Sequence, residues 1–126
     1  DTKYRNWTVR QIAYHLADAH MHVYIRWKLA LTEDVPTIKP WSESAWAELE
    51  HAKAGPIEAA LLLNDAVHTA WVDLIRSLSL RDMMREFFHP EINQRVRLVD
   101  MLRTYAWHGE HHLRQIEWLR STRGWE

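Results

Sequence analysis

Two histidines four residues apart, His108 and His112, carry the clearest chemical signal in this sequence. Apolar residues recur at helical spacing around them, and on a helix residues four apart project from the same face. Two imidazoles placed in this way can reach one divalent cation at about 2.0–2.1 Å each. The motif alone is equally compatible with two ordinary surface or core histidines, so a third ligand on another element has to decide.

The strongest candidate for that third ligand is His15, which lies midway along the first predicted helix. It sits beside an apolar stripe, where a neutral imidazole needs a polar partner. Alone, such a histidine is more often a satisfied core residue than a ligand. Together with His108 and His112 it would supply three neutral nitrogens, which leave the charge of the cation uncompensated and at least one coordination position open. That arrangement is typical of catalytic metal sites, where a bound water has its pKa lowered towards neutrality.

The other six histidines are weaker candidates. His111 follows His108 by three residues and competes with His112, but the four-residue spacing aligns better with one cation. His20 and His22 are expected on the surface of the first helix. Three histidines without a partner at ligand spacing are expected to be structural: His51, His68 and His89.

Asp18 follows His15 by three residues, which is about one helical turn. It could orient a ligand imidazole as a hydrogen-bond acceptor, or act as a base on metal-bound water. A solvated helix carboxylate is an equally good interpretation of the same residue.

The helix that positions His15 is predicted from Val9 to about Leu31, a stretch without proline or glycine. Thr8 can cap the amide of Gln11, whose side chain can reach back, which is the capping-box arrangement. Trp7 before the cap can pack against an apolar residue in the first turn as a hydrophobic staple. The apolar stripe of this helix has helical spacing: Ile12, Leu16, Ala19, Val23 and Trp27.

A connection follows the first helix, because Pro36 and Pro40 lie there among polar residues. A short helix is expected next, capped by Ser42 or Ser44 and ending by Gly55. These residues predict that the chain travels some distance before it forms its second long helix.

The second long helix is predicted from Pro56, a residue favoured at the first helical position, to about Leu78. Ser79 opens a brief turn of helix, and the run Phe87-Phe88-His89-Pro90 breaks it, followed by a loop. The last helix is predicted from about Leu98 to Arg120, with the two histidines of the four-residue motif on its apolar side.

Composition restricts the classes of protein to which this chain can belong. Its 126 residues suffice for one compact domain, and no linker or repeat divides them, so residues 1–126 are predicted to form a single domain. The absence of cysteine excludes disulfides and thiolate ligands and leaves His, Asp and Glu to bind a metal. A net charge of −1 does not indicate a nucleic-acid surface. No apolar run approaches the roughly 20 residues that span a bilayer.

Nine histidines, eight tryptophans and three glycines with helical periodicity are typical of an all-α bundle. Three long helices bury their apolar stripes less well than four. We therefore expect either a further helix upstream of Asp1 or a partner chain that covers the gap.

Segments along nearly the whole chain, in the same order, carry a resemblance to a known family: Trp7–Gln11, His15–Met21, Tyr24–Glu33, Ile38–Trp41, Ala45–Leu49, Phe88–Glu91, Tyr105–His108 and His111-His112. They are similar to the YfiT-like branch of the DinB superfamily.

This resemblance implies an all-α, DinB-like four-helix bundle with a long crossover, here lacking the N-terminal helix that usually precedes the Trp7 motif. It also implies one zinc or nickel ion per chain, held by His15, His108 and His112, and imidazole ligands suit both metals. Family members are regarded as metal-dependent hydrolases and tend to be homodimers in the bacterial cytoplasm. We therefore expect a cytoplasmic homodimer that acts on a small molecule, without nucleic-acid or membrane partners.

Three functions remain open on this basis. The first is a metal-dependent hydrolase in which the three-histidine site activates water and Asp18 is an auxiliary base. The second is a metal-dependent thiol S-transferase, in which a low-molecular-weight thiol such as bacillithiol takes the open position on the same site. The third is a non-catalytic helical domain that binds metal or a partner protein. The residues do not separate hydrolysis from thiol transfer, because the thiol would come from outside the chain.

Overall fold

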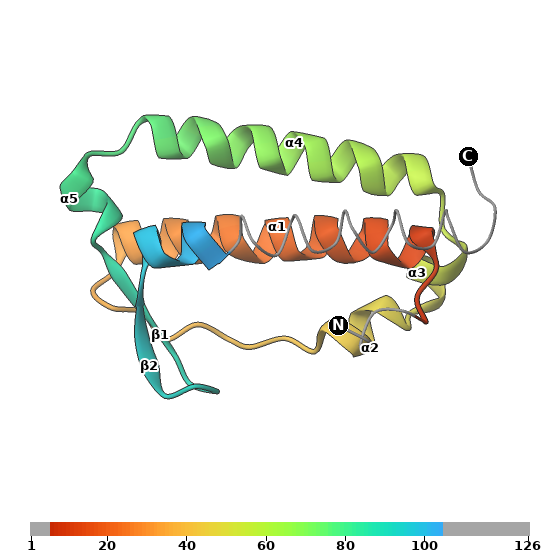
Figure 1. Cartoon of the computed structure of the whole chain (residues 1–126), viewed down its shortest axis with the longest axis horizontal. Helices are drawn as coiled ribbons and strands as arrows, with labels where there is room; N and C mark the ends of the chain where they lie inside the picture. Colours follow the sequence, from red (N-terminus) through yellow and green to blue (C-terminus); the bar gives the residue numbers. More distant parts are fainter. Residues whose placement is uncertain (1–5, 105–126) are drawn as a thin grey trace.

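The structure is a computed structural model that describes residues 6–104 of the chain. Two long helices dominate it, with a short hairpin at one end (Figure 1). The elements in chain order are α1 (Val9–Thr32), α2 (Glu43–Ala47), α3 (Glu50–Ala54), α4 (Ile57–Arg76), α5 (Leu80–Met83), β1 (Glu86–His89) and β2 (Gln94–Arg97). Residues 98–104 are helical as well. The predicted all-α character is therefore confirmed, with one small antiparallel sheet added.

The beginning of α1 follows the local prediction. The Thr8 hydroxyl accepts a hydrogen bond from the amide of Gln11 at 3.1 Å, and the Gln11 side chain accepts one from the amide of Thr8 at 3.0 Å. Trp7 and Ile12 are both buried and belong to one apolar cluster, as a hydrophobic staple requires. Gln11 also donates to the carbonyl of Ala47 at 2.8 Å, which ties α2 to this end of the helix.

Helices α1 and α4 lie side by side and run in the same direction (Figure 1). The chain must therefore return along the length of the bundle between them, and residues 33–56 make this crossover. Its extended part passes the hairpin. There the amide of Ile38 donates a hydrogen bond to the carbonyl of Phe88 at 3.0 Å, and the amide of Phe88 donates one to the carbonyl of Pro36 at 2.8 Å. The predicted long connection is thus a tethered segment rather than a free loop.

The hairpin was not predicted. Phe87 pairs with Val96 in an antiparallel register, and Asn93 adopts a positive φ of 52° in the turn. The short helix does end before Phe87 and Asn93 does lie in a turn, as predicted, but the residues on either side of this turn form strands, which the sequence pattern did not predict. Each strand has four residues, and only Phe87 among them is buried, so the alternation is too short to stand out in the sequence.

The main core lies where α1, α4, the hairpin and the helical residues from 98 meet. Trp27 and Leu98 are completely buried there, and the Trp27 ring packs edge-to-face on Trp71 with centroids 5.5 Å apart. Arg85 lies beside the C-terminal end of α1, where its guanidinium donates hydrogen bonds to the carbonyls of Ala30 at 2.8 Å and Glu33 at 2.9 Å. These bonds satisfy carbonyls that the end of α1 leaves without intrahelical donors.

The last helix begins at residue 98 as predicted, and its predicted continuation, with His108 and His112, lies outside the described residues. Within residues 6–104, the structure contains no helix that is both long and apolar enough to cross a membrane.

We expect Trp27→Ala to lower the free energy of unfolding by about 3–5 kcal/mol, since it removes a fully buried ring and leaves a cavity. Leu62→Ala on α4 is the control, because Leu62 is 71% exposed and its truncation should change stability by no more than about 0.5 kcal/mol. Urea unfolding measures both. Equal effects in the two variants would contradict this account of the core.

Candidate functional site

The side chain of His15 is buried beside two tryptophan rings. It is 1% exposed, and its ring lies 5.2 Å from that of Trp7 and 5.9 Å from that of Trp41, centroid to centroid. Trp7 precedes α1, whereas Trp41 comes from the crossover. This location suits a metal ligand, because an imidazole held in one orientation by packed rings loses little freedom on binding a cation.

The other two predicted ligands, His108 and His112, lie outside the described residues, so the structure does not show whether they meet His15. In residues 6–104 no group of three histidine, aspartate or glutamate side chains comes together in a way that could hold a metal ion. A site built on His15 therefore requires ligands from beyond this range, and the chemistry of a buried neutral imidazole fits such a site.

Asp18 lies close to His15 on α1 and is half-buried. Burial raises the pKa of its carboxyl group from 3.8 to about 6, and the nearby His51 opposes this shift. The carboxylate is therefore not a fully solvated one. It is largely ionised at pH 7 but can take up a proton under mildly acidic conditions.

The prediction that His20 lies on the surface of α1 was wrong. His20 is 9% exposed, donates from Nδ1 to the carbonyl of Leu16 at 2.8 Å, and has Nε2 at 3.1 Å from Nδ1 of His68 on α4. Burial lowers the pKa of His20. The reason is that α4 covers this side of α1, which the spacing of apolar residues on α1 alone does not reveal.

His22 is half-buried rather than on the open surface. Its Nδ1 donates to the carbonyl of Asp18 at 2.8 Å, and its ring stacks on Trp41 with centroids 4.2 Å apart and an interplanar angle of 6°. Burial lowers the pKa of His22, so its neutral form is favoured. Of the histidines expected to be structural, His51 packs on the ring of Tyr14 at 4.4 Å.

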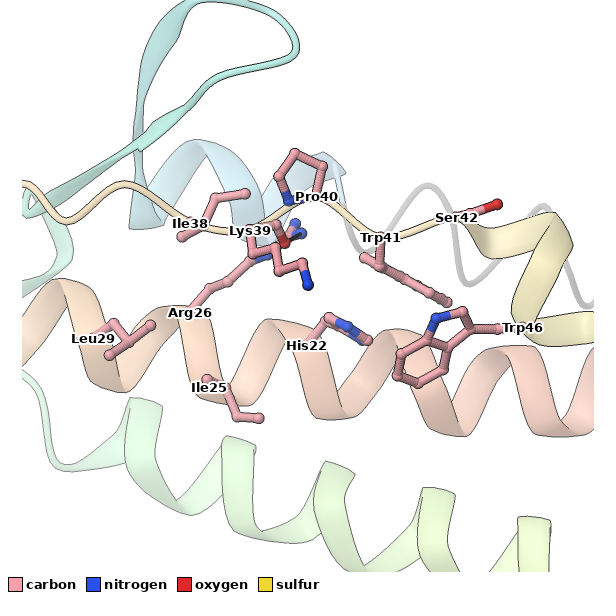
Figure 2. A pocket seen from close by; sticks show the side chains of 10 residues that line it. All are labelled: His22, Ile25, Arg26, Leu29, Ile38, Lys39, Pro40, Trp41, Ser42 and Trp46. Carbon is pink, nitrogen blue, oxygen red and sulfur yellow. Dashed lines mark hydrogen bonds between the residues drawn. The ribbon is translucent and has the colours of Figure 1, made fainter.

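Three cavities adjoin this face of α1, and Arg26 lines all of them. They measure about 440, 550 and 150 Å³. Figure 2 shows the first, in which Arg26 extends from α1 towards the crossover and the rings of His22, Trp41 and Trp46 gather beside it. The smallest cavity also reaches Met101 and Thr104, at the start of the last helix.

Arg26, Trp41 and Trp46 were missed as site residues. One signal was available for Arg26, because residues 7 and 11 positions after His15 return to the same helical face, and these are His22 and Arg26. No local pattern points to the two tryptophans, since the crossover alone brings them over α1.

Comparisons with known proteins agree with this architecture. The model of the DinB superfamily matches residues 3–116 of the chain. Two relatives, from Bacillus cereus (strain B4264) and Bacillus thuringiensis subsp. konkukian (strain 97-27), are each 46% identical over 127 aligned positions, covering 99% of this chain and 72% of their own length. Both are named "Putative metal-dependent hydrolase".

Among solved structures, YfiT from Bacillus subtilis superposes with a TM-score of 0.91 at 42% identity, covering 95% of this chain and 69% of that one. It is described as "a probable metal-dependent hydrolase with an unusual four-helix bundle topology". This likeness confirms the bundle class that was predicted from the resemblance.

We expect Asp18→Asn to gain stability relative to the parent protein as the pH rises from 4 to 7. Because the pKa of Asp18 is raised from 3.8 to about 6 on folding, the folded protein keeps a proton that the unfolded chain releases between these values. The parent therefore loses stability through this window, by about 1 kcal/mol after allowance for solvent screening. Asparagine does not titrate and shows no such loss.

Urea unfolding of the metal-free proteins at pH 4, 5, 6 and 7 tests this, with Asp73→Asn, an exposed carboxylate on α4, as control. A difference between Asp18→Asn and the parent that stays constant with pH would contradict the raised pKa.

Proposed function

Because the chain belongs to the DinB superfamily, and within it to the YfiT-like proteins, we propose that it is a metal-dependent hydrolase of a small molecule. In this proposal His15, His108 and His112 bind one zinc or nickel ion per chain. The observation that carries it is the buried imidazole of His15, packed between Trp7 and Trp41 on the face of α1 that the cavities adjoin.

The predicted last helix would bring the other two ligands to the same face. Thr104 lines the smallest cavity together with His22 and Arg26. The start of the last helix therefore lies near the face of α1 that carries His22 and Arg26. If the helix continues as the sequence predicts, His108 follows Thr104 by one turn and His112 by two, on the same side.

A divalent ion bound there would supply Lewis acidity, lowering the pKa of a water and polarising a substrate carbonyl or phosphoryl group. The chain's own residues have separate tasks. His15 presents a neutral nitrogen in a fixed orientation, and the surrounding tryptophans limit access of bulk water. Asp18, about one turn away and largely ionised at pH 7, can accept the proton of a nucleophilic water at its carboxylate.

The proposal includes a homodimer in the cytoplasm, as the family resemblance implies. Sedimentation of the tag-free protein measures its oligomeric state, and a monomer would remove this part while leaving the metal site untouched.

We expect tag-free protein to contain about one zinc or nickel ion per chain and His15→Ala to lose it, because two remaining imidazoles hold a divalent ion far less tightly. Elemental analysis measures the content after incubation with each metal. His51→Ala is the matched control, since His51 is an exposed histidine that packs on Tyr14 and is not one of the three proposed ligands. Thermal unfolding confirms that both variants are folded.

Absence of metal from the parent protein after loading, or equal loss in His15→Ala and His51→Ala, would overturn the assignment. Absence of metal would leave a helical interaction domain as the interpretation, whereas equal loss would place the metal at a site other than the one proposed.

We expect Asp18→Asn to retain the metal but to lower kcat by about 10²- to 10⁴-fold, which is the usual loss on removal of a general base. The substrates are those that the metal-loaded parent hydrolyses in a screen of esters, amides and phosphoesters, with Asp73→Asn as control. An unchanged kcat would reject the base role of Asp18 and leave the metal site standing.

A further inference from the structure

Arg26 is a half-buried cation with few partners of its own. Within residues 6–104 its guanidinium makes one hydrogen bond, from Nη2 to the carbonyl of Lys39, and this bond is long at 3.3 Å. A guanidinium carries five N–H donors and pairs best with an oxyanion that accepts two of them at once. Arg26 therefore has the donors and the location to bind an anionic ligand.

The charges around Arg26 decide on which side such a ligand is favoured. In the 440 Å³ cavity Lys39 is a second cation, and none of the described residues that line this cavity is an acid. The 550 Å³ cavity is lined by Glu43 and Glu91, the two carboxylates that raise the pKa of Arg26 against the lowering effect of burial. Among the described residues, the lining of the first cavity therefore favours an anion over that of the second.

Flat rings form the other end of the 440 Å³ cavity (Figure 2). His22 and Trp41 are stacked at 4.2 Å, and Trp46 meets them edge-on, at 4.9 Å from His22 and 5.1 Å from Trp41. Trp46 lines this cavity and is 37% exposed. Ile25 and Leu29 of α1 add apolar surface to the lining of this cavity. This lining suits an apolar body attached to the anionic group.

We propose that the 440 Å³ cavity between α1 and the crossover binds the anionic end of an elongated substrate. Arg26 and Lys39 hold its carboxylate or phosphate group, and the rings of His22, Trp41 and Trp46 contact its apolar body. The inference rests on the proposed function, because it assigns the substrate class of that same site.

The spacing along α1 makes this a remote anchor rather than a reacting group. His15 and Arg26 are 11 residues apart on one face, which corresponds to about 16 Å along the helix axis. Trp41 covers the part of this interval nearer to His15, since its ring contacts both His15 and His22. The bond that is broken would lie at the His15 end, about three turns from the anion.

Isothermal titration calorimetry on the metal-free protein tests the anchor. The probes are 4-phenylbutyrate, phenyl phosphate and the neutral amide 4-phenylbutyramide. We expect one or both anions to bind about tenfold or more tightly than the amide, and Arg26→Gln to abolish this preference, because a charge-assisted bidentate contact is lost. Tighter binding of 4-phenylbutyrate assigns a carboxylate and of phenyl phosphate a phosphate, and either supports the proposal.

Two further variants keep the test decisive. Arg81→Gln on α5 removes an exposed arginine and should leave the anion preference unchanged. Lys39→Gln, an exposed change in the crossover, should weaken anion binding several-fold and carries the test if Arg26→Gln does not fold. Equal binding of anions and amide by the parent protein, or the same loss in Arg81→Gln as in Arg26→Gln, would overturn the proposal.

Because the titrations need no metal, they separate this inference from the proposed function. A protein that prefers the anions but binds no metal refutes the metal site alone. A protein that loses metal in His15→Ala but shows no anion preference refutes the anchor alone.

Discussion

The parallel course of α1 and α4 is the constraint on which the rest of the described structure depends. Two parallel neighbours cannot be joined by a short turn, so residues 33–56 must travel back along the bundle. Backbone hydrogen bonds of Ile38 and Phe88 attach the first part of this segment to the hairpin. A hydrogen bond from Gln11 attaches α2, further along the segment, to the beginning of α1. Trp41 lies between these two attachments, and it is therefore placed over the face of α1 that carries His15 and His22.

Much of the fold was predictable because its signals are local. The capping box of Thr8 and Gln11, the length of α1 and the start of the last helix at residue 98 follow from neighbours within a turn or two. The hairpin was not predicted because its strands are only four residues long. It also pairs with Thr37 in the crossover, which is distant in the sequence. Local periodicity carries no information about such pairing.

The candidate site shows the same division. His15 was identifiable because a histidine beside an apolar stripe needs a partner, and the structure places it in the interior. His20 was placed on the surface because nothing in α1 indicates which of its other sides α4 covers, and its partner His68 lies 48 residues away. The role of Arg26 depends on the crossover in the same way, since Lys39, Trp41 and Trp46 become its neighbours only once α1 and α4 are parallel.

One helix face thus carries two different environments, an aromatic one that favours neutral groups and one that contains a cation. Around His15 the aromatic rings favour neutral groups and a ligand held without competition from water. Three turns further, Arg26 is half-buried, and the carboxylates of Glu43 and Glu91 raise its pKa against the lowering effect of burial. Because the two ends share α1 as a rigid support, the distance between them is fixed by helix geometry rather than by loop conformation. Under the proposed metal site and anion anchor, a substrate that contacts both ends must match that distance, so α1 would set the length of the molecules that this face can accept.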